Sequence, residues 1–407
     1  MITKYIHRSI EPVLRRVVEQ FPAVTLTGPR QSGKTTVLKE LFGKTHRYVS
    51  MELPNTRIAA ESDPQGFLAI YPPPVIIDEI QNVPILLPYI KEIIDNRRDE
   101  AGLFILTGSQ NLALLGNVTE SLAGRTAILR LLPMSQLEIS GIEDSGFPWE
   151  RTDSQLPIPS IPLTQLWRNL IRGFYPELIS KPNIETEDWH GSYVQSYLER
   201  DVRSIRQVGD LVLFQSFISA LAARSGQLLN LTNIAHDIGI SGNTVKHWLS
   251  VLEASFLVII LRPYFVNVGK RLVKLPKIYF TDTGTLCYLT GITEPKHAIS
   301  GPMAGAIFET AVVTEIYKRF MHRGQVPRVY FWRTSAGVEI DLLIDTGNQL
   351  IPIEIKHTAT ARPAMASSIK TIFKDFPEKV TQGYVIYPGD IRLPLMPKVL
   401  ALPFSEL

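Results

Sequence analysis

One short stretch, residues 28–35, limits what this chain can fold into more than any other. It reads Gly-Pro-Arg-Gln-Ser-Gly-Lys-Thr and matches the phosphate-binding pattern Gly-x-x-x-x-Gly-Lys-Ser/Thr at every fixed position. The apolar, β-branched segment 23–27 precedes it, and a helical pattern at 36–42 follows it. This order aims backbone N–H groups and the positive end of a helix at one point. The stretch therefore predicts a site for nucleotide phosphates rather than an ordinary glycine-rich turn.

The residues of this loop have separate expected roles. We expect Lys34 to reach the β- and γ-phosphates and the Thr35 hydroxyl to hold Mg²⁺, so ATP and Mg²⁺ are the expected cofactors. The other loop positions are expected to bind phosphate oxygens. The full set is Gly28, Pro29, Arg30, Gln31, Ser32, Gly33, Lys34, Thr35 and Thr36.

Two adjacent carboxylates, Asp78 and Glu79, follow the continuous apolar run Pro-Val-Ile-Ile. Such a run is typical of a strand buried in a parallel sheet, and ligands bind at the carboxyl ends of these strands. We expect Asp78 to hold Mg²⁺ through its water shell and Glu79 to orient and deprotonate an attacking water. The alternative is a helix N-terminus that favours acidic residues.

A further strand pattern, 103–107, runs into polar residues that could sit between Glu79 and the γ-phosphate. The candidates are Thr107, Ser109 and Gln110, and Ser109 would also serve as a helix cap. The sequence does not choose between them.

Arg125 stands just before a last strand pattern, 126–131. It is a candidate arginine finger for the γ-phosphate of a neighbouring subunit, which would require a homo-oligomer. A surface or ion-paired arginine explains it equally well. Arg200 and Arg203, in a helical stretch, are further candidates for sensing the nucleotide, although ion pairs with Glu199 or Asp201 along the helix surface are the favoured alternative for each.

The composition excludes several classes of protein. The single cysteine, Cys287, excludes an internal disulfide and a cysteine-rich zinc site. A formal net charge of +3 permits nucleic-acid binding but does not argue for it. The most apolar run, 256–261, is far too short to span a bilayer, so we expect a cytoplasmic protein without a membrane partner.

A chain of 407 residues is too long for a single core, so two or three domains are expected. We predict an α/β nucleotide-binding domain with a parallel sheet, a linker rich in proline and polar residues, a helical and winged-helix domain, and an α/β C-terminal domain. Their predicted ranges are 1–140, 141–162, 163–295 and 296–407.

Residues 228–257 have a helix-turn-helix pattern, with Gly239 at the turn and Ser241 as a cap of the second helix. Strand patterns at 256–261 and 277–280 follow as wings would. The outward residues of the second helix include Asn243, Lys246 and His247, which would meet DNA. Because only one of these is a lysine, a winged helix that packs inside the protein without touching DNA is the favoured alternative.

The C-terminal part reads as a helix, three strands, a helix and a strand. In the third strand, Glu354 and Lys356 alternate with apolar residues and therefore share one face, and Asp341 lies on the neighbouring strand. Two convergent carboxylates predict a Mg²⁺ or Mn²⁺ site, with the lysine beside it to orient water or stabilise phosphoryl charge. The alternatives are an edge hairpin with charged outward residues and a nuclease fold that has lost its activity.

Several of these motifs together resemble a known family. Residues 28–36, Ile-Ile-Asp-Glu-Ile-Gln, Leu-Thr-Gly-Ser and Leu-Ala-Gly-Arg resemble the prokaryotic AAA+ type ATPases with an AAA_14 domain and a DUF4143 C-terminal region. Gly-Phe-Tyr-Pro-Glu (173–177), Tyr-Leu-Glu-Arg-Asp (197–201) and Ile-Tyr-Phe-Thr-Asp-Thr-Gly (278–284) extend the resemblance over nearly the whole chain. The resemblance implies an AAA+ sheet, a winged-helix middle and a nuclease-like C-terminal domain.

The C-terminal motif is similar to the PD-(D/E)xK nuclease core, which resembles the fold of restriction endonucleases. Carried over by position, Asp341 and Glu354 would be metal ligands, Lys356 the catalytic lysine and Glu309 the acid on the preceding helix. The chain is thus expected to hydrolyse ATP and to act on or near nucleic acid, with DNA as a candidate partner. The rival hypothesis is an ATP-dependent switch whose nuclease-like domain only binds a protein or DNA.

Overall fold

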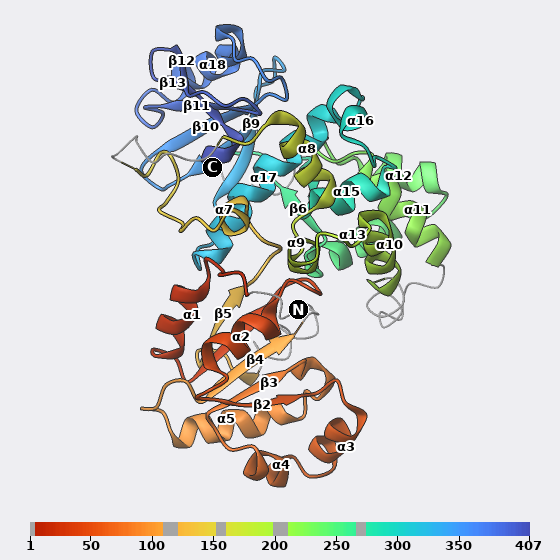
Figure 1. Ribbon diagram of the computed structural model, residues 1–407, viewed down its shortest axis with the longest axis vertical. Helices are drawn as coiled ribbons and strands as arrows, with labels where there is room; N and C mark the ends of the chain where they lie inside the picture. The colour runs from red at the N-terminus through yellow and green to blue at the C-terminus, as the bar shows by residue number, and fades with distance from the viewer. Residues whose placement is uncertain (1–4, 109–120, 152–159, 198–210, 266–273) are drawn as a thin grey trace.

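The computed structural model describes residues 5–108, 121–151, 160–197, 211–265 and 274–407. Three regions follow one another along the chain (Figure 1). They are an N-terminal α/β region in red to orange, a helical region in olive to teal, and a C-terminal region around a second sheet in blue. No helix of the described part is both long enough and apolar enough to cross a membrane.

The N-terminal region is built on a five-stranded sheet. Its strands are β1 (Ala23–Thr27), β2 (Arg47–Ser50), β3 (Val75–Asp78), β4 (Phe104–Gly108) and β5 (Thr126–Arg130). They lie in the order β2-β3-β4-β1-β5, and all neighbouring pairs are parallel. The parallel sheet expected from the sequence is confirmed.

Helices cover both faces of this sheet. They are α1 (Glu11–Val18), α2 (Lys34–Phe42), α3 (Pro54–Ser62), α4 (Pro64–Ile70) and α5 (Leu86–Asn96). Val24 and Ile105 share a core with residues of α1 and α2, whereas Ile77 and Phe104 pack with residues of α5 on the other face. Because neither face is left to solvent, successive strand positions are apolar, which produced the continuous runs in the sequence.

The helical region contains the expected helix-turn-helix. Its helices are α8 (Leu163–Arg172), α9 (Pro176–Ser180), α10 (Thr186–Tyr197), α11 (Leu211–Ala222), α12 (Leu231–Ile238), α13 (Gly242–Ala254), α15 (Thr283–Leu289) and α16 (Pro295–Ser300). Gly239 ends α12 in the left-handed conformation, and the Ser241 hydroxyl accepts the Thr244 N–H at the start of α13. The antiparallel strands β6 (Val258–Leu261) and β7 (Lys277–Phe280) follow as the wing.

The C-terminal region has the predicted order of helix, three strands, helix and strand, and then adds two strands. These elements are α17 (Ala304–His322), β8 (Val329–Arg333), β9 (Glu339–Asp345), β10 (Leu350–Ile355), α18 (Ser367–Asp375), β11 (Gly383–Tyr387), β12 (Leu393–Met396) and β13 (Val399–Pro403). The mixed sheet has the order β12-β13-β11-β10-β9-β8. β10 pairs antiparallel with β9 and parallel with β11.

Helix α17 lies where the three regions meet and contacts β5, β7, β10, α15 and α16 (Figure 1). Four ionisable side chains on it are at most 1% exposed: Glu315, Lys318, Arg319 and His322. Buried charges need partners inside the protein. The partners of these side chains lie in the segment 134–146, which includes α7 (Gln136–Ser140). Their respective partners are Gln136 N–H, the Met134 carbonyl, Asp144 and Glu138.

The core of the helical region yields a stability prediction at Trp248. Its ring, 3% exposed, packs against Phe214 and Phe217 with centroid distances of 5.0 and 5.5 Å. Trp248→Ala should lower the free energy of unfolding by about 3–5 kcal/mol, because it leaves a large cavity in this core. Asn243→Ala, at an exposed position of the same helix, should change it by less than about 0.5 kcal/mol. Urea unfolding followed by circular dichroism measures both, and equal midpoints would contradict the packing described.

Candidate functional site

The phosphate-binding motif forms the turn between β1 and α2. Gly28 lies so close to the next strand segment that an added Cβ would stand 2.1 Å from the Leu131 carbonyl oxygen. Gly33 has a φ of 93° and precedes α2 as its N-cap residue, a conformation that glycine adopts without strain. Both fixed glycines of the motif are therefore required by the backbone. The start of α2 then points into the turn, as anion binding requires.

Lys34 is buried within this turn. Its Nζ donates to the carbonyl oxygens of Gly28 and Pro29, at 3.0 and 2.8 Å. The ammonium thus lies across the loop at the site where the motif places phosphate. Lys34, Thr35 and Thr36 all line the same cavity.

Asp78 is the last residue of β3 and Glu79 follows it, at the edge of the sheet where the loop also lies. Asp78 accepts hydrogen bonds from Thr35 Oγ1 (2.9 Å), Tyr48 OH (2.7 Å) and Thr107 Oγ1 (3.1 Å). The carboxyl ends of parallel strands meet at one edge, which explains why β1, β3 and β4 bring these groups together. Thr35 and Asp78, the two residues that the sequence assigned to Mg²⁺ in this domain, are thus hydrogen-bonded to each other.

Glu79 adopts a left-handed backbone conformation, with φ of 56° and ψ of 44°. A residue other than glycine in this conformation is uncommon and concentrates at functional sites. Gln81 Nε2 donates to the Glu79 carboxylate, which also lines the cavity. Of the three candidates for a polar group near Glu79, Thr107 donates to Asp78, while Ser109 and Gln110 lie outside the described residues.

An open cavity of about 960 Å³ lies over the phosphate loop. Several parts of the chain form its walls, and one of them belongs to the helical region. Its lining includes Tyr5, Ile6 and Arg8 before α1; Arg30, Gln31 and Gly33 from the loop; and Pro176, Glu177, Ser180, Tyr193 and Ser196 from α9 and α10. The volume and the mixed walls suit a nucleotide, with phosphates at the loop and the remainder toward α9.

Two motifs of the helical region hold this wall in place. Asp282 caps α15 through Thr285 N–H and also accepts the Phe174 N–H at 2.7 Å. Gly173 has a φ of 82°, and an added Cβ there would stand 2.5 Å from the Asp282 carboxylate. The Gly-Phe-Tyr-Pro-Glu and Thr-Asp-Thr-Gly motifs therefore meet, and together they position Pro176 beside Gly33 of the loop.

The four residues of the nuclease-like motif also lie together. Lys356 Nζ is 2.5 Å from Glu354 Oε1, and Asp341 Oδ2 accepts the backbone N–H of Ile355 at 2.8 Å. Burial raises the pKa of Asp341 well above its usual range, and the nearby charges of Glu309 and Glu354 raise it further. Burial raises the pKa of Glu354 as well, although Lys356 opposes this shift.

A lysine from the helical region enters this cluster. Nζ of Lys277, on β7, lies 3.0 Å from Glu309 and 2.7 Å from Glu339. Tyr279 of the same strand donates to Glu309 at 2.6 Å. Burial alone would lower the pKa of Lys277, but the surrounding carboxylates raise it, so Lys277 stays charged. The cluster is therefore neutralised in part by an ammonium group.

The expected second metal site is not supported by this arrangement. Within the described ranges, no group of three or more His, Cys, Asp or Glu side chains is placed to hold a metal ion. Glu309 is bound by Lys277 and Tyr279, Glu354 by Lys356, and Asp341 by a backbone N–H. Protein donors thus bind one oxygen of each carboxylate that the sequence assigned to Mg²⁺ or Mn²⁺.

Comparisons with known proteins agree with this architecture. Residues 20–140 match an AAA domain (AAA_14), and residues 163–296 and 304–407 match two domains of unknown function, DUF8612 and DUF4143. Uncharacterized proteins of Mycobacterium bovis and Mycobacterium tuberculosis are each 30% identical to the chain over 398 residues, which is 97% of this chain and 82% of theirs. The chain belongs to the AAA_14/DUF4143 family.

Solved structures also resemble parts of the chain. A Walker-type ATPase of Pyrococcus abyssi is 14% identical, with a TM-score of 0.44, over 71% of this chain and 99% of that one. The RuvB Holliday junction branch migration motor of Thermotoga maritima is 15% identical, with a TM-score of 0.30, over 61% of this chain and 88% of that one.

Arg125 lies at an ion pair within its own chain. Its Nε and Nη2 donate to Asp95 at 2.7 and 3.0 Å. A finger acting on a neighbouring subunit would first have to leave Asp95, so that role stays a prediction. Arg200 and Arg203 lie outside the described residues.

Sequence reasoning missed two groups of the AAA_14 site, Tyr48 and Arg8. The Tyr48 hydroxyl binds Asp78 from the edge strand β2, and Arg8 binds the loop from before α1. Neither belongs to a spaced motif. Only the pairing of β2 with β3 brings Tyr48 to Asp78, and no signal in the sequence would have identified it.

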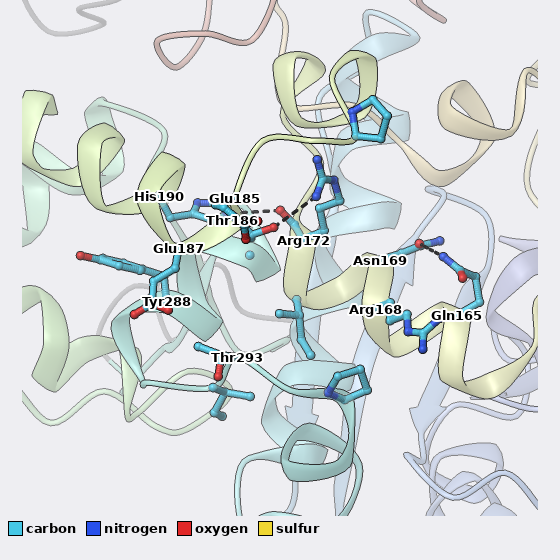
Figure 2. A pocket seen from close by; sticks show the side chains of 15 residues that line it. Gln165, Arg168, Asn169, Arg172, Glu185, Thr186, Glu187, His190, Tyr288 and Thr293 are labelled. Atoms are coloured by element: carbon cyan, nitrogen blue, oxygen red, sulfur yellow. Dashed lines mark hydrogen bonds between the residues drawn. The ribbon is translucent and has the colours of Figure 1, made fainter.

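A second cavity, of about 450 Å³, lies among α8, α10, α15 and α16 (Figure 2). Several of the polar side chains drawn in it form hydrogen bonds with other groups of the protein. Arg172 donates to Thr186 and to the Leu178 and Lys181 carbonyls, and a ring nitrogen of His190 binds the Arg172 carbonyl. These contacts hold the helices together and leave the cavity without a recognisable binding constellation.

The DUF4143 cluster yields a prediction on pH. The pKa of Asp341 is raised in the folded protein, so its contribution to stability is present below the unfolded pKa and is lost as pH rises through the folded pKa. Asparagine cannot ionise, so Asp341→Asn removes the cost of placing an ionisable carboxyl group in this buried position. It should therefore unfold at a higher temperature than the parent at pH 8, with the difference shrinking toward pH 4.

Thermal unfolding in the presence of a chelator measures this effect. Asp345→Asn, at the other end of β9, is the matched control and should track the parent at every pH. A lower unfolding temperature for Asp341→Asn at pH 8 would show that the Asp341 charge stabilises the fold.

Proposed function

We propose that the chain binds ATP with Mg²⁺ and hydrolyses it. The observation that carries this proposal is the hydrogen bond of 2.9 Å from the Thr35 hydroxyl to the Asp78 carboxylate. It lies next to the phosphate loop, whose Gly28 carbonyl accepts a hydrogen bond from Lys34. These are the groups that the AAA_14 motifs assign to metal and phosphate. Membership of the AAA_14/DUF4143 family supports the same activity.

The residues fit a magnesium ion chemically. Mg²⁺ prefers oxygen ligands and is commonly held by a hydroxyl, one or two carboxylates and substrate phosphates. The Thr35 hydroxyl and the Asp78 carboxylate supply such oxygens side by side, and Tyr48 and Thr107 fix the orientation of Asp78. When bound, the ion would neutralise charge on the phosphates.

Glu79 is the proposed general base. Its left-handed backbone turns the side chain into the cavity, and Gln81 holds the carboxylate in place. Such a base acts by orienting a water and accepting its proton as the water attacks the terminal phosphorus. Lys34 and the N–H groups of the loop then stabilise the charge on the transferred group.

For the C-terminal domain we infer a binding role rather than cleavage of nucleic acid. The observation that favours it is Lys277, which occupies the carboxylates of Glu309 and Glu339. DNA is one candidate partner of the chain, and it would bind through the helical region, where Asn243 and Lys246 are exposed on α13. Comparing ATP turnover with and without added DNA tests whether DNA is that partner.

Lys34→Ala tests nucleotide binding. The phosphates would lose their buried cationic partner, and charge-assisted bonds of this kind are the strong ones, so tight binding of ATP should be abolished. Lys44→Ala, an exposed lysine just after the same helix, should bind as the parent does. Isothermal titration with ATP and Mg²⁺ measures both. Parent-like binding by Lys34→Ala would overturn the proposed function.

Glu79→Gln separates binding from chemistry. The amide keeps the shape of the carboxylate but cannot accept the proton, so turnover should fall by roughly two orders of magnitude or more while ATP still binds. Glu40→Gln, which also lines the cavity, is the control and should keep its turnover. Phosphate release under saturating ATP gives the rates, and an unchanged rate for Glu79→Gln would place the base elsewhere.

A further inference from the structure

Arg8 binds the phosphate loop from outside the motif and is 5% exposed. Its Nη1 donates to the Ser32 carbonyl at 2.7 Å, and its Nη2 donates to the Leu132 carbonyl at 2.8 Å. One planar guanidinium therefore connects the loop to the segment that follows β5. This contact uses the fork of donors that only arginine has.

The contact with Ser32 has a consequence for the next residue. The carbonyl of Ser32 and the N–H of Gly33 belong to one planar trans peptide and point in opposite directions. Arg8 holds the carbonyl, and it thereby orients the N–H of Gly33, which lines the nucleotide cavity. Backbone N–H groups of such loops are what bind phosphate oxygens.

Glu138 compensates the charge of Arg8. Its Oε2 lies 3.2 Å from Arg8 Nε, and its carboxylate also accepts the backbone N–H groups of Ser9 and Ser135, at 2.7 and 2.8 Å. Burial would raise the pKa of Glu138, but Arg8 holds it well below its usual range. The carboxylate is therefore charged and tightly held on α7.

His322 joins this pair to α17. Its Nε2 accepts the Leu132 N–H at 3.2 Å, so the ring proton lies on Nδ1, which stands 3.2 Å from Glu138 Oε1. The ring is fully buried. Arg8 and His322 thus bind the same carboxylate, and both also bind the backbone of Leu132.

We propose that Arg8 is a positioning residue of the nucleotide site and that Glu138 and His322 link it to α17. Phosphate binding at the loop and the packing of the first helix of the DUF4143 domain then depend on each other. This inference rests on the proposed binding of ATP. Such coupling is reciprocal, so a change at His322 alters nucleotide affinity although His322 does not line the nucleotide cavity.

Arg8→Lys tests the positioning role. Lysine keeps the charge beside Glu138, but one ammonium cannot replace a fork that spans Ser32, Leu132 and Glu138. Affinity for a non-hydrolysable ATP analogue with Mg²⁺ should fall roughly tenfold or more, the range for lost hydrogen bonds to a charged group. Arg392→Lys makes the same change at an arginine that pairs with Glu406 and does not line the nucleotide cavity, and it should bind as the parent does.

Two variants of His322 test the link. His322→Leu removes both bonds and should weaken analogue binding, whereas His322→Gln can donate to Glu138 and accept from Leu132 and should restore it. Hydrogen exchange supplies a second readout. The analogue should slow exchange of α17 amides in the parent and in Arg392→Lys, but not in Arg8→Lys at saturating analogue.

The outcomes separate this inference from the proposed function. Failure of the parent to bind the analogue would overturn the proposed function itself, and this inference with it. Parent-like affinity in Arg8→Lys would overturn the positioning role alone. Equal affinity in His322→Leu and His322→Gln, or the same α17 response in Arg8→Lys, would overturn the link to α17.

Discussion

Compensation of buried charge on α17 is the constraint on which the arrangement of the three regions depends. This helix is buried on most sides, yet it carries Glu315, Lys318, Arg319 and His322 inside the protein. Left without a partner, each of these buried groups would destabilise the fold. The segment that follows β5 supplies a hydrogen-bond or ion-pair partner to each of them, and so the C-terminal region is held to the end of the nucleotide-binding sheet. Replacing that segment would leave several buried charges unpaired at once.

The nucleotide site also depends on how these regions pack together. The part of the site that faces the phosphates comes from neighbouring residues, because the loop and the start of α2 are contiguous in the chain. The other sides of the cavity come from distant residues. Pro176 lies beside the loop because Asp282 anchors the turn before α9. A ligand in this cavity therefore touches the sheet and the helical region together. Binding at such a boundary is the usual way in which a nucleotide changes the relation between two parts of a protein.

Electrostatics also decides the character of the C-terminal cluster. Carboxylates that gather at one point must bind protons, metal or basic side chains. Here Lys277 arrives from the wing of the helical region, and Lys356 lies beside Glu354. The cluster therefore joins two regions, and a nuclease-like arrangement of strands need not imply a nuclease-like site. The fold and the chemistry of this domain have to be argued separately.

The sequence by itself determined the elements whose cause is local. The loop, the strand before Asp78 and the helix-turn-helix around Gly239 depend on the spacing of neighbouring residues, and all were found where expected. The metal site predicted for the C-terminal domain is not supported by the structure, because Lys277 binds Glu309. Lys277 lies 32 residues before Glu309, and no sequence pattern connects the two. Arg8 and Tyr48 were missed for the same reason. Only tertiary packing decides which distant side chain binds a buried carboxylate. Burial lowers the local dielectric constant and so strengthens the attraction to any side chain of opposite charge, wherever it lies in the chain.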